Sequence, residues 1–321
     1  MATNSSAGSR AYAAAHFALE LDDVKGSVGL FRSIEGGGVK ADVMTHQFAA
    51  NEQVGFQRYR QLGKPKFEDI KLQVGMAMSQ PFYVWMTDFF AGKGTRKNGA
   101  IVAADFYYVE RARRTFTEAL IKEVTFPKLD AADKNAVYMT IALAVEDIAF
   151  KKGDGKKLEA PKGFAAQKNW SSCNFRFSID GLGDSCKRVT KVDSFTVKQN
   201  VAEYHMGGRK AAVKTPTVVE YPNLTFYVPE ADAQPFIDAM ATSVGYGGMG
   251  NGTVRDPKKL NGYVETYDND MRPLFYVHFY GADILSVTPD RSDSTSEEIK
   301  QVKIEVYTER MEFDYPVMDL E

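Results

Sequence analysis

The feature that most constrains this 321-residue chain is an internal repeat. The motif Gln-Pro-Phe-x-x-x-Met occurs at Gln80–Met86 and again at Gln234–Met240, a spacing of 234 − 80 = 154. At the same spacing, the alternating stretch FEDIKLQV (67–74) aligns with YPNLTFYV (221–228). A period this long indicates two whole domains rather than a solenoid of short repeats.

A second register extends the repeat toward the start of each unit. A spacing of 175 − 17 = 158 aligns FALELD at 17–22 with FRFSID at 175–180, and it also aligns the Val-Lys pair at 39–40 with the pair at 197–198. The change from 158 to 154 indicates that the second unit lacks four residues. We place this deletion in the polar stretch 47–62, because length changes concentrate in surface loops.

Each unit is predicted to be mainly β. Period-2 alternation predicts a strand, a turn, two strands around the Val-Lys pair and a fourth strand, followed by one short helix, a loop and two more strands. Near the end of each unit, IKEVTFP (121–127) lies opposite DILSVTP (283–289), with the prolines in register. The predicted fold is therefore two tandem antiparallel β-sandwich or barrel domains.

The repeated motif begins the helix of each unit. Proline suits a first helical turn because its φ is fixed and its missing N–H needs no partner there. The apolar residues that follow recur at helical spacing, which predicts a buried face rather than a catalytic motif. This predicted packing face consists of Phe82, Trp85, Met86, Phe236 and Met240.

Composition divides the chain into four segments. Residues 1–14 are rich in Ala, Ser and Gly and are predicted to form a flexible arm, followed by a first domain at 15–150. Residues 151–170 begin with the charged run KKGDGKKLEAPKG, which has no periodicity and is typical of a linker. The second domain is predicted at 171–321.

The overall composition is that of an ordinary soluble protein. The net charge is −2, 44% of residues are hydrophobic, and we find neither a signal peptide nor an apolar run long enough to cross a membrane. We therefore expect no membrane association. The two cysteines, Cys173 and Cys186, are too few for a disulfide framework and are predicted to fill apolar positions in a reducing compartment.

Motifs that would carry chemistry are weak. The Gly-x-Gly-x-x-Gly spacing at 245–250 follows a predicted helix instead of opening one, which is the wrong context for dinucleotide binding. The four histidines lack metal-ligand spacing, and the basic cluster at 111–114 is not repeated in the second unit. We expect no catalytic residue, cofactor or metal, and no enzyme activity.

The strand pattern resembles the tail tube protein family of contractile phage tails and bacterial contractile injection systems. That family's pattern begins with a Phe-x-Val-x-Ile-Asp-Gly strand and a Ser- and Gly-rich segment, and it ends with a Gly-x-Pro-x-Tyr strand and a Trp-bearing helix. The corresponding elements here are 17–22, 33–43, 63–72 and the helix with Trp85. The second unit is similar but has Ala239 in place of the tryptophan. Family members usually have one such domain, so the duplication is a departure.

The resemblance implies a structural subunit of the inner tube, or of a tube-to-hub ring, that forms stacked rings with a lumen by strand pairing between chains. The implied partners are copies of itself, in rings of three or six chains, together with sheath and baseplate or hub proteins. Cargo or DNA would pass through the lumen. The implied location is the cytoplasm during assembly and then a virion or injection particle. The alternative is a capping or adaptor protein that binds the tube end, and an enzyme is the least favoured interpretation.

Two stretches of the first unit are candidate inter-subunit loops. One is a glycine-rich segment between predicted strands, and the other is the polar stretch before the fourth strand. The candidate residues are Gly36, Gly37, Gly38, Asn51, Gly55, Tyr59 and Arg60. For the three glycines, a bulge or tight turn is the alternative interpretation.

Overall fold

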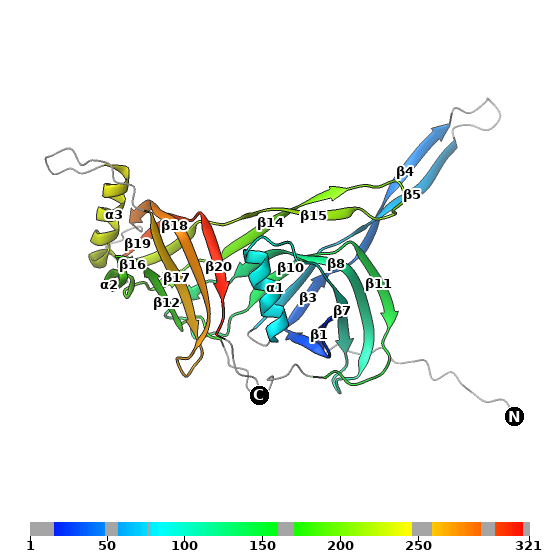
Figure 1. The fold of residues 1–321 in the computed structure, drawn as a ribbon, viewed down its shortest axis with the longest axis horizontal. Helices are drawn as coiled ribbons and strands as arrows, with labels where there is room; N and C mark the ends of the chain where they lie inside the picture. Colours follow the sequence, from blue (N-terminus) through cyan, green and yellow to red (C-terminus); the bar gives the residue numbers. More distant parts are fainter. Residues whose placement is uncertain are drawn as a thin grey trace.

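The computed structural model describes residues 16–48, 57–75, 78–159, 170–245, 259–289 and 299–316, without the side chains of residues 47, 48 and 57. Two β-rich halves lie side by side, each with one longer helix (Figure 1). The helices are α1 (Gln80–Phe90), α2 (Gly183–Cys186) and α3 (Gln234–Val244), with a 3-10 turn η2 (Glu230–Asp232) before α3. The predicted mainly-β fold with a helix in each unit is confirmed.

Strands make up most of both halves. The strands of the first half are β1 (His16–Leu21), β2 (Ser27–Phe31), β3 (Ser33–Gly36), β4 (Val39–Phe48), β5 (Gln57–Phe67), β6 (Ile70–Val74), β7 (Lys97–Ala104), β8 (Glu110–Phe126), β9 (Leu129–Asp130), β10 (Met139–Ala144) and β11 (Asp147–Lys152). Those of the second half are β12 (Phe175–Ile179), β13 (Lys191–Val192), β14 (Phe195–Tyr204), β15 (Val213–Glu220), β16 (Leu224–Pro229), β17 (Leu260–Tyr267), β18 (Pro273–Pro289), β19 (Gln301–Tyr307) and β20 (Arg310–Asp314).

The strands form three sheets, and the two large sheets mix strands from the two halves. A ten-stranded sheet runs β2-β1-β7-β8-β10-β6-β3, with β11 and β14 also on β8, and with β15 on β14. An eight-stranded sheet runs β12-β17-β18-β19-β16-β13-β9, with β20 on β18. The hairpin β4–β5 is a separate two-stranded sheet. The first sheet thus contains β14 and β15 of the second half, and the second contains β9 of the first half.

The strand pairing shows the tandem repeat directly. Ile34 of β3 lies opposite Leu72 of β6, and Val192 of β13 lies opposite Phe226 of β16. These pairs are related by the two predicted spacings, since 192 − 34 = 158 and 226 − 72 = 154. The predicted registers before the helix are therefore confirmed.

After the helix, the spacing differs from the prediction. Ile141 of β10 lies opposite Leu72, and Ile304 of β19 lies opposite Phe226, the 154-spaced partner of Leu72. The observed spacing is therefore 304 − 141 = 163. The register that aligned the two prolines, at 162, is wrong by one residue. In a strand, a one-residue slip turns every side chain to the opposite face, so this correction decides which residues correspond.

The number of strands after each helix also differs from the prediction. The sequence predicts two, whereas the structure has four long ones in each half, β7, β8, β10 and β11 in the first and β17 to β20 in the second. Strand β7 is built largely from small residues, so alternation does not reveal it, yet Ala100, Ile101 and Val102 are buried. The sequence YMTIALAVEDIAF (138–150) reads as one alternating run but belongs to two strands, because the chain bends between β10 and β11.

The range predicted to be a linker begins inside an element of the first half. Lys151 and Lys152 are the last residues of β11, and backbone hydrogen bonds join Gly153 and Leu158 to Arg111 and Tyr108 at 2.9 and 2.8 Å. The division of the chain at 151–170 stays a prediction.

The two cysteines differ in accessibility, which gives a simple chemical prediction. Cys186 is buried, and burial raises the pKa of its thiol to about 11, whereas Cys173 is partly exposed. The thiolate is the reactive form. We expect iodoacetamide at pH 8 to modify Cys173 well before Cys186, as measured by peptide mass spectrometry over time. Equal rates for the two cysteines in the folded protein would contradict the buried position of Cys186.

Candidate assembly interface

A strand joint connects the two halves. Strand β14 of the second half pairs with the end of β8 in the first half, with Val197 opposite Val124 and Thr196 opposite Thr125. The two valines are fully buried, and the threonine hydroxyls lie 2.9 Å apart. The joint extends the first sheet by strand addition, a mode in which backbone hydrogen bonds give the affinity.

An aromatic cluster closes the joint beside these strands. The ring of Phe313, on β20 of the second half, lies 5.8 Å from the ring of Phe90 on α1 and 6.4 Å from that of Phe126 at the end of β8. Phe126 also stacks on Phe195 of β14 at 4.8 Å, and Tyr83 of α1 stacks on Tyr315 at the same distance. The second half therefore fills a groove between α1 and β8 with buried aromatic surface, which favours association through the hydrophobic effect.

A buried carboxylate anchors the hairpin β14–β15 to the first half. Oε1 of Glu146 accepts hydrogen bonds from Arg96 Nη1 and from the backbone N–H of Lys214, both at 2.8 Å. Oε2 accepts one from Arg209 Nη1 at 3.3 Å. Glu146 and Arg96 belong to the first half, whereas Lys214 and Arg209 belong to the hairpin. Because a buried charge is costly without partners, this arrangement holds the hairpin in place.

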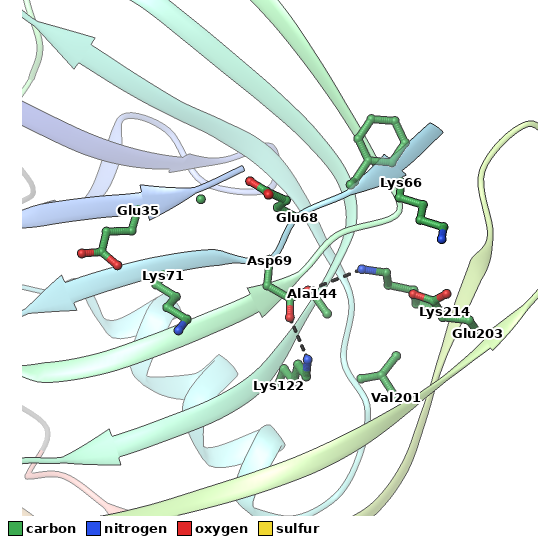
Figure 2. Close-up of a pocket in the computed structure, with 12 residues that line it drawn as sticks. Glu35, Lys66, Glu68, Asp69, Lys71, Lys122, Ala144, Val201, Glu203 and Lys214 are labelled. Atoms are coloured by element: carbon green, nitrogen blue, oxygen red, sulfur yellow. Dashed lines mark hydrogen bonds and ion pairs between the residues drawn. The ribbon is translucent and has the colours of Figure 1, made fainter. Parts of the chain in front are cut away.

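A charged cavity of about 540 Å³ lies under the hairpin. Figure 2 shows Lys122 and Lys214 reaching Asp69 from two sides, at 2.7 and 3.5 Å. The hydrogen bond to Asp69 raises the pKa of Lys122 despite partial desolvation, which keeps the ammonium charged. The lining contains four lysines and four carboxylates, so the cavity has no excess of either charge. This balance suits a polar seam between two protein surfaces more than an anion site.

The two hairpins of the repeat lie in different environments. Hairpin β14–β15 runs from the second half across the first half, whereas its counterpart β4–β5 extends away from the body of the molecule (Figure 1). In the described part of the chain, β4 pairs with β5 alone. Only one of two equivalent hairpins is therefore docked along a sheet.

Helix α3 lies at the end of the molecule opposite β11 (Figure 1). An apolar groove of about 520 Å³ lies beside this helix. It is lined by Glu230, Ala233, Ile237, Met240, Ala241, Val244, Val287, Pro289 and Val302. It occupies the position in the second half that Phe313 fills in the first half, between the helix and the end of the long strand. Large exposed apolar patches mark sites of interaction with proteins, membranes or ligands.

The structure places the candidate inter-subunit residues in two locations. Gly36 ends β3, and Gly37 and Gly38 connect it to β4, whereas Tyr59 and Arg60 lie exposed on β5. Asn51 and Gly55 lie outside the described residues. Gly36 and Gly37 have φ of +75° and +69°, and a Cβ on Gly36 would lie 2.1 Å from the carbonyl oxygen of Asp69. A tight turn there requires glycine.

The predicted helix packing face lies toward the core. Phe82, Trp85, Met86 and Phe236 are buried, and Met240 is partly buried in the wall of the apolar groove. The indole Nε1 of Trp85 donates a hydrogen bond to the carbonyl of Thr95 at 2.8 Å. The residues of the strand joint and of the Glu146 network were not among the sequence candidates, because they connect segments that lie far apart along the chain. None of the described helices is long and apolar enough to cross a membrane.

Fold and joint together define a tandem, mainly-β protein whose two halves associate by strand addition. A family profile described as "T4-like virus tail tube protein gp19" matches residues 13–149 and 171–312, which is most of the chain and one match in each half. The chain belongs to this family. A comparison with curated protein sequences found no match.

Three similar solved structures each cover less than half of this chain. A chain of the anti-feeding prophage baseplate is 11% identical, covering 45% of this chain and 93% of its own, with a TM-score of 0.33. A chain of an extracellular contractile injection system sheath–tube complex is 15% identical and covers 44% and 89%, with a TM-score of 0.33. A chain of the anti-feeding prophage tube-terminating cap is 17% identical and covers 44% and 89%, with a TM-score of 0.34.

Proposed function

We propose that the chain is a structural subunit of a tail tube or of a ring at the tube end, assembling into rings around a lumen. The family to which the chain belongs is named for a tube protein. The observation that carries the proposal is the difference between the two hairpins, since β14–β15 is docked on a neighbouring half and the equivalent β4–β5 extends away from the body (Figure 1). An exposed strand edge is a template for pairing with another chain.

Three chains in one ring are favoured over six chains in two layers. The internal joint adds strand β14 of the second half to the sheet of the first half. The two halves of one chain therefore lie side by side, along the direction in which strands are added to the sheet. Three chains would then supply six units to one ring, which is the smaller of the two ring sizes that the resemblance implies. In the assembled particle, sheath and baseplate or hub proteins would be the partners of such a ring, and cargo or DNA would pass through its lumen.

Electron microscopy across a concentration series tests this proposal. We expect the purified full-length chain to form rings about ten nanometres across, from domains about thirty ångströms wide placed in a circle. Rings that stack into tubes would indicate a tube subunit, and rings that never stack would indicate a cap or adaptor at the tube end. Compact monomers at every concentration would contradict the proposed function.

A further inference from the structure

We propose that the joint inside the chain is repeated between chains, so that the outer end of the first half docks on the outer end of the second half of another copy. This inference rests on the proposed function, because it names the contact that would close the ring. It follows from comparing the main residues of the internal joint with their counterparts in the other half. The counterparts have the same place in the repeat, and most of them are more exposed than the residues of the internal joint.

The receiving side of the joint is open in the second half. Tyr83 and Phe90 of α1 are covered by the second half, and Tyr83 is only 8% exposed. At the 154 spacing their counterparts on α3 are Ile237, 41% exposed, and Val244, 59% exposed. These two residues line the apolar groove.

The inserting side of the joint is open in the first half. Phe313 of β20 is 2% exposed, because it lies between α1 and the end of β8. Its counterpart at the 163 spacing is Phe150 of β11, which is 62% exposed. A phenylalanine on the outer face of a strand is costly to leave in water. The groove beside α3 is the counterpart of the place where Phe313 sits, and Phe150 has the side chain that would fill it.

The strand edges of the joint are open at both ends as well. Within the described residues, the segment of β18 from Leu285 to Pro289 pairs with β19 alone. In the internal joint, Val197 lies opposite Val124, and the counterparts of these residues are Val39 and Val287. Val39 is 45% exposed, whereas Val197 is fully buried. Repeating the joint between chains therefore places Val39 of one copy opposite Val287 of the next.

The buried carboxylate of the joint has a matching counterpart. Glu309 corresponds to Glu146 and Lys259 to Arg96, since 309 − 146 and 259 − 96 both equal the spacing observed after the helix. Nζ of Lys259 lies 2.8 Å from Oε1 of Glu309, as Arg96 does from Glu146. The side chain of Glu309 is 60% exposed and that of Glu146 only 6%. In the repeated joint, the backbone N–H of Arg60, the counterpart of Lys214, would donate to Glu309.

The geometry of one chain prevents it from closing this contact on itself. The open groove beside α3 and the inserting elements β4 and β11 lie at opposite ends of the molecule (Figure 1). A head-to-tail contact between different surfaces builds a ring when its rotation closes. The occupant that matches the groove in apolar character, strand edge and charge is therefore a second copy of this chain.

Disulfide trapping between two variants tests the inference. Both native cysteines are replaced (Cys173→Ser, Cys186→Ala), folding is checked by circular dichroism, and a Val39→Cys chain is mixed with a Val287→Cys chain under mild oxidation. Residues opposite each other in antiparallel strands have Cα atoms about 4.5–5.5 Å apart, which suits a disulfide. We expect a covalent dimer on a non-reducing gel. A Val124→Cys/Val197→Cys single chain is the positive control, because it uses the internal copy of the same pair.

The matched negative control is Val43→Cys with Val287→Cys. Val43 is also exposed on β4, but it lies four residues further on, roughly 13 Å along the strand. We expect at least about tenfold less dimer from this pair, because cysteines whose Cα atoms are more than about 7 Å apart cannot be bridged without backbone movement. Equal trapping by the two pairs, in a chain that still forms rings, would overturn the inference and leave the proposed function standing. Absence of rings, together with absence of disulfides between chains, would instead contradict the proposed function.

Discussion

Replacing Phe313 with alanine is expected to lower the free energy of unfolding by about 3–5 kcal/mol, the range for removing a large buried aromatic side chain. Phe313 is buried where the two halves meet, and its ring contacts those of Phe90, Phe126 and Phe275 at 5.8, 6.4 and 5.5 Å. Truncation would leave a cavity between α1 and β8. The surrounding elements could not move in to fill it, because the strand joint holds β8 and β14 in place on one side. The measurement is urea denaturation of dilute, monomeric protein followed by circular dichroism.

Phe150→Ala is the matched control for Phe313→Ala. The two phenylalanines are equivalent in the repeat, but Phe150 is exposed in the single chain. A substitution at such a position usually changes stability by less than about 0.5 kcal/mol. Similar losses for the two variants in monomeric protein would contradict the assignment of Phe313 to the joint. In ring assembly, Phe150→Ala should have the larger effect of the two variants, because it weakens the association between chains that are themselves stable.

The second large effect is expected for Glu146→Ala, which should lower the free energy of unfolding by about 3 kcal/mol, near the lower bound for breaking a buried ion pair because Arg96 is partly exposed. The substitution removes the acceptor of Arg96 Nη1 and of the Lys214 backbone N–H. The hairpin β14–β15 would then lose its anchor, and protease cleavage near residues 205–212 should become faster.

Glu309→Ala provides the comparison for Glu146→Ala. Glu309 pairs with Lys259 at 2.8 Å but is mostly exposed, and exposed ion pairs contribute about 1 kcal/mol or less. We expect the two variants to differ by at least about 2 kcal/mol in urea denaturation, as those two ranges imply. A loss for Glu309→Ala as large as that for Glu146→Ala would show that burial in the joint does not set the cost.

The sequence predicts those features that depend on local pattern. Alternation identifies the strands that carry Leu72 and Phe226, and the proline-led motif identifies α1 and α3, because side chains repeat with the period of the element. The two spacings before the helix could be predicted because the aligned residues are of the same type in both units. Family membership follows from the same pattern and is shown by the profile match in each half.

The joint could not be predicted in this way, because it depends on pairings between distant segments. Nothing in β14 alone indicates that it pairs with β8 instead of extending outward as β4 does.

The register after the helix, which was predicted with an error of one residue, can be identified from a pair of equivalent turn residues. Asp105 and Asp268, which correspond in the observed register, each accept two backbone N–H bonds in a turn, at 2.9 and 3.0 Å and at 2.9 and 2.8 Å. Aligning these turn residues rather than the prolines would have given the observed register.

The number of chains in the assembled ring tests the central claim most directly, and native mass spectrometry of the full-length protein measures it. One chain has a mass of 35.7 kDa, so the mass of a ring divided by this value gives the number of chains. We predict a species of three times the chain mass, with six β units and every joint equivalent to the internal one. A smallest assembled species of six times the chain mass, with none at three times, or a protein that stays at 35.7 kDa at all concentrations, would contradict the claim.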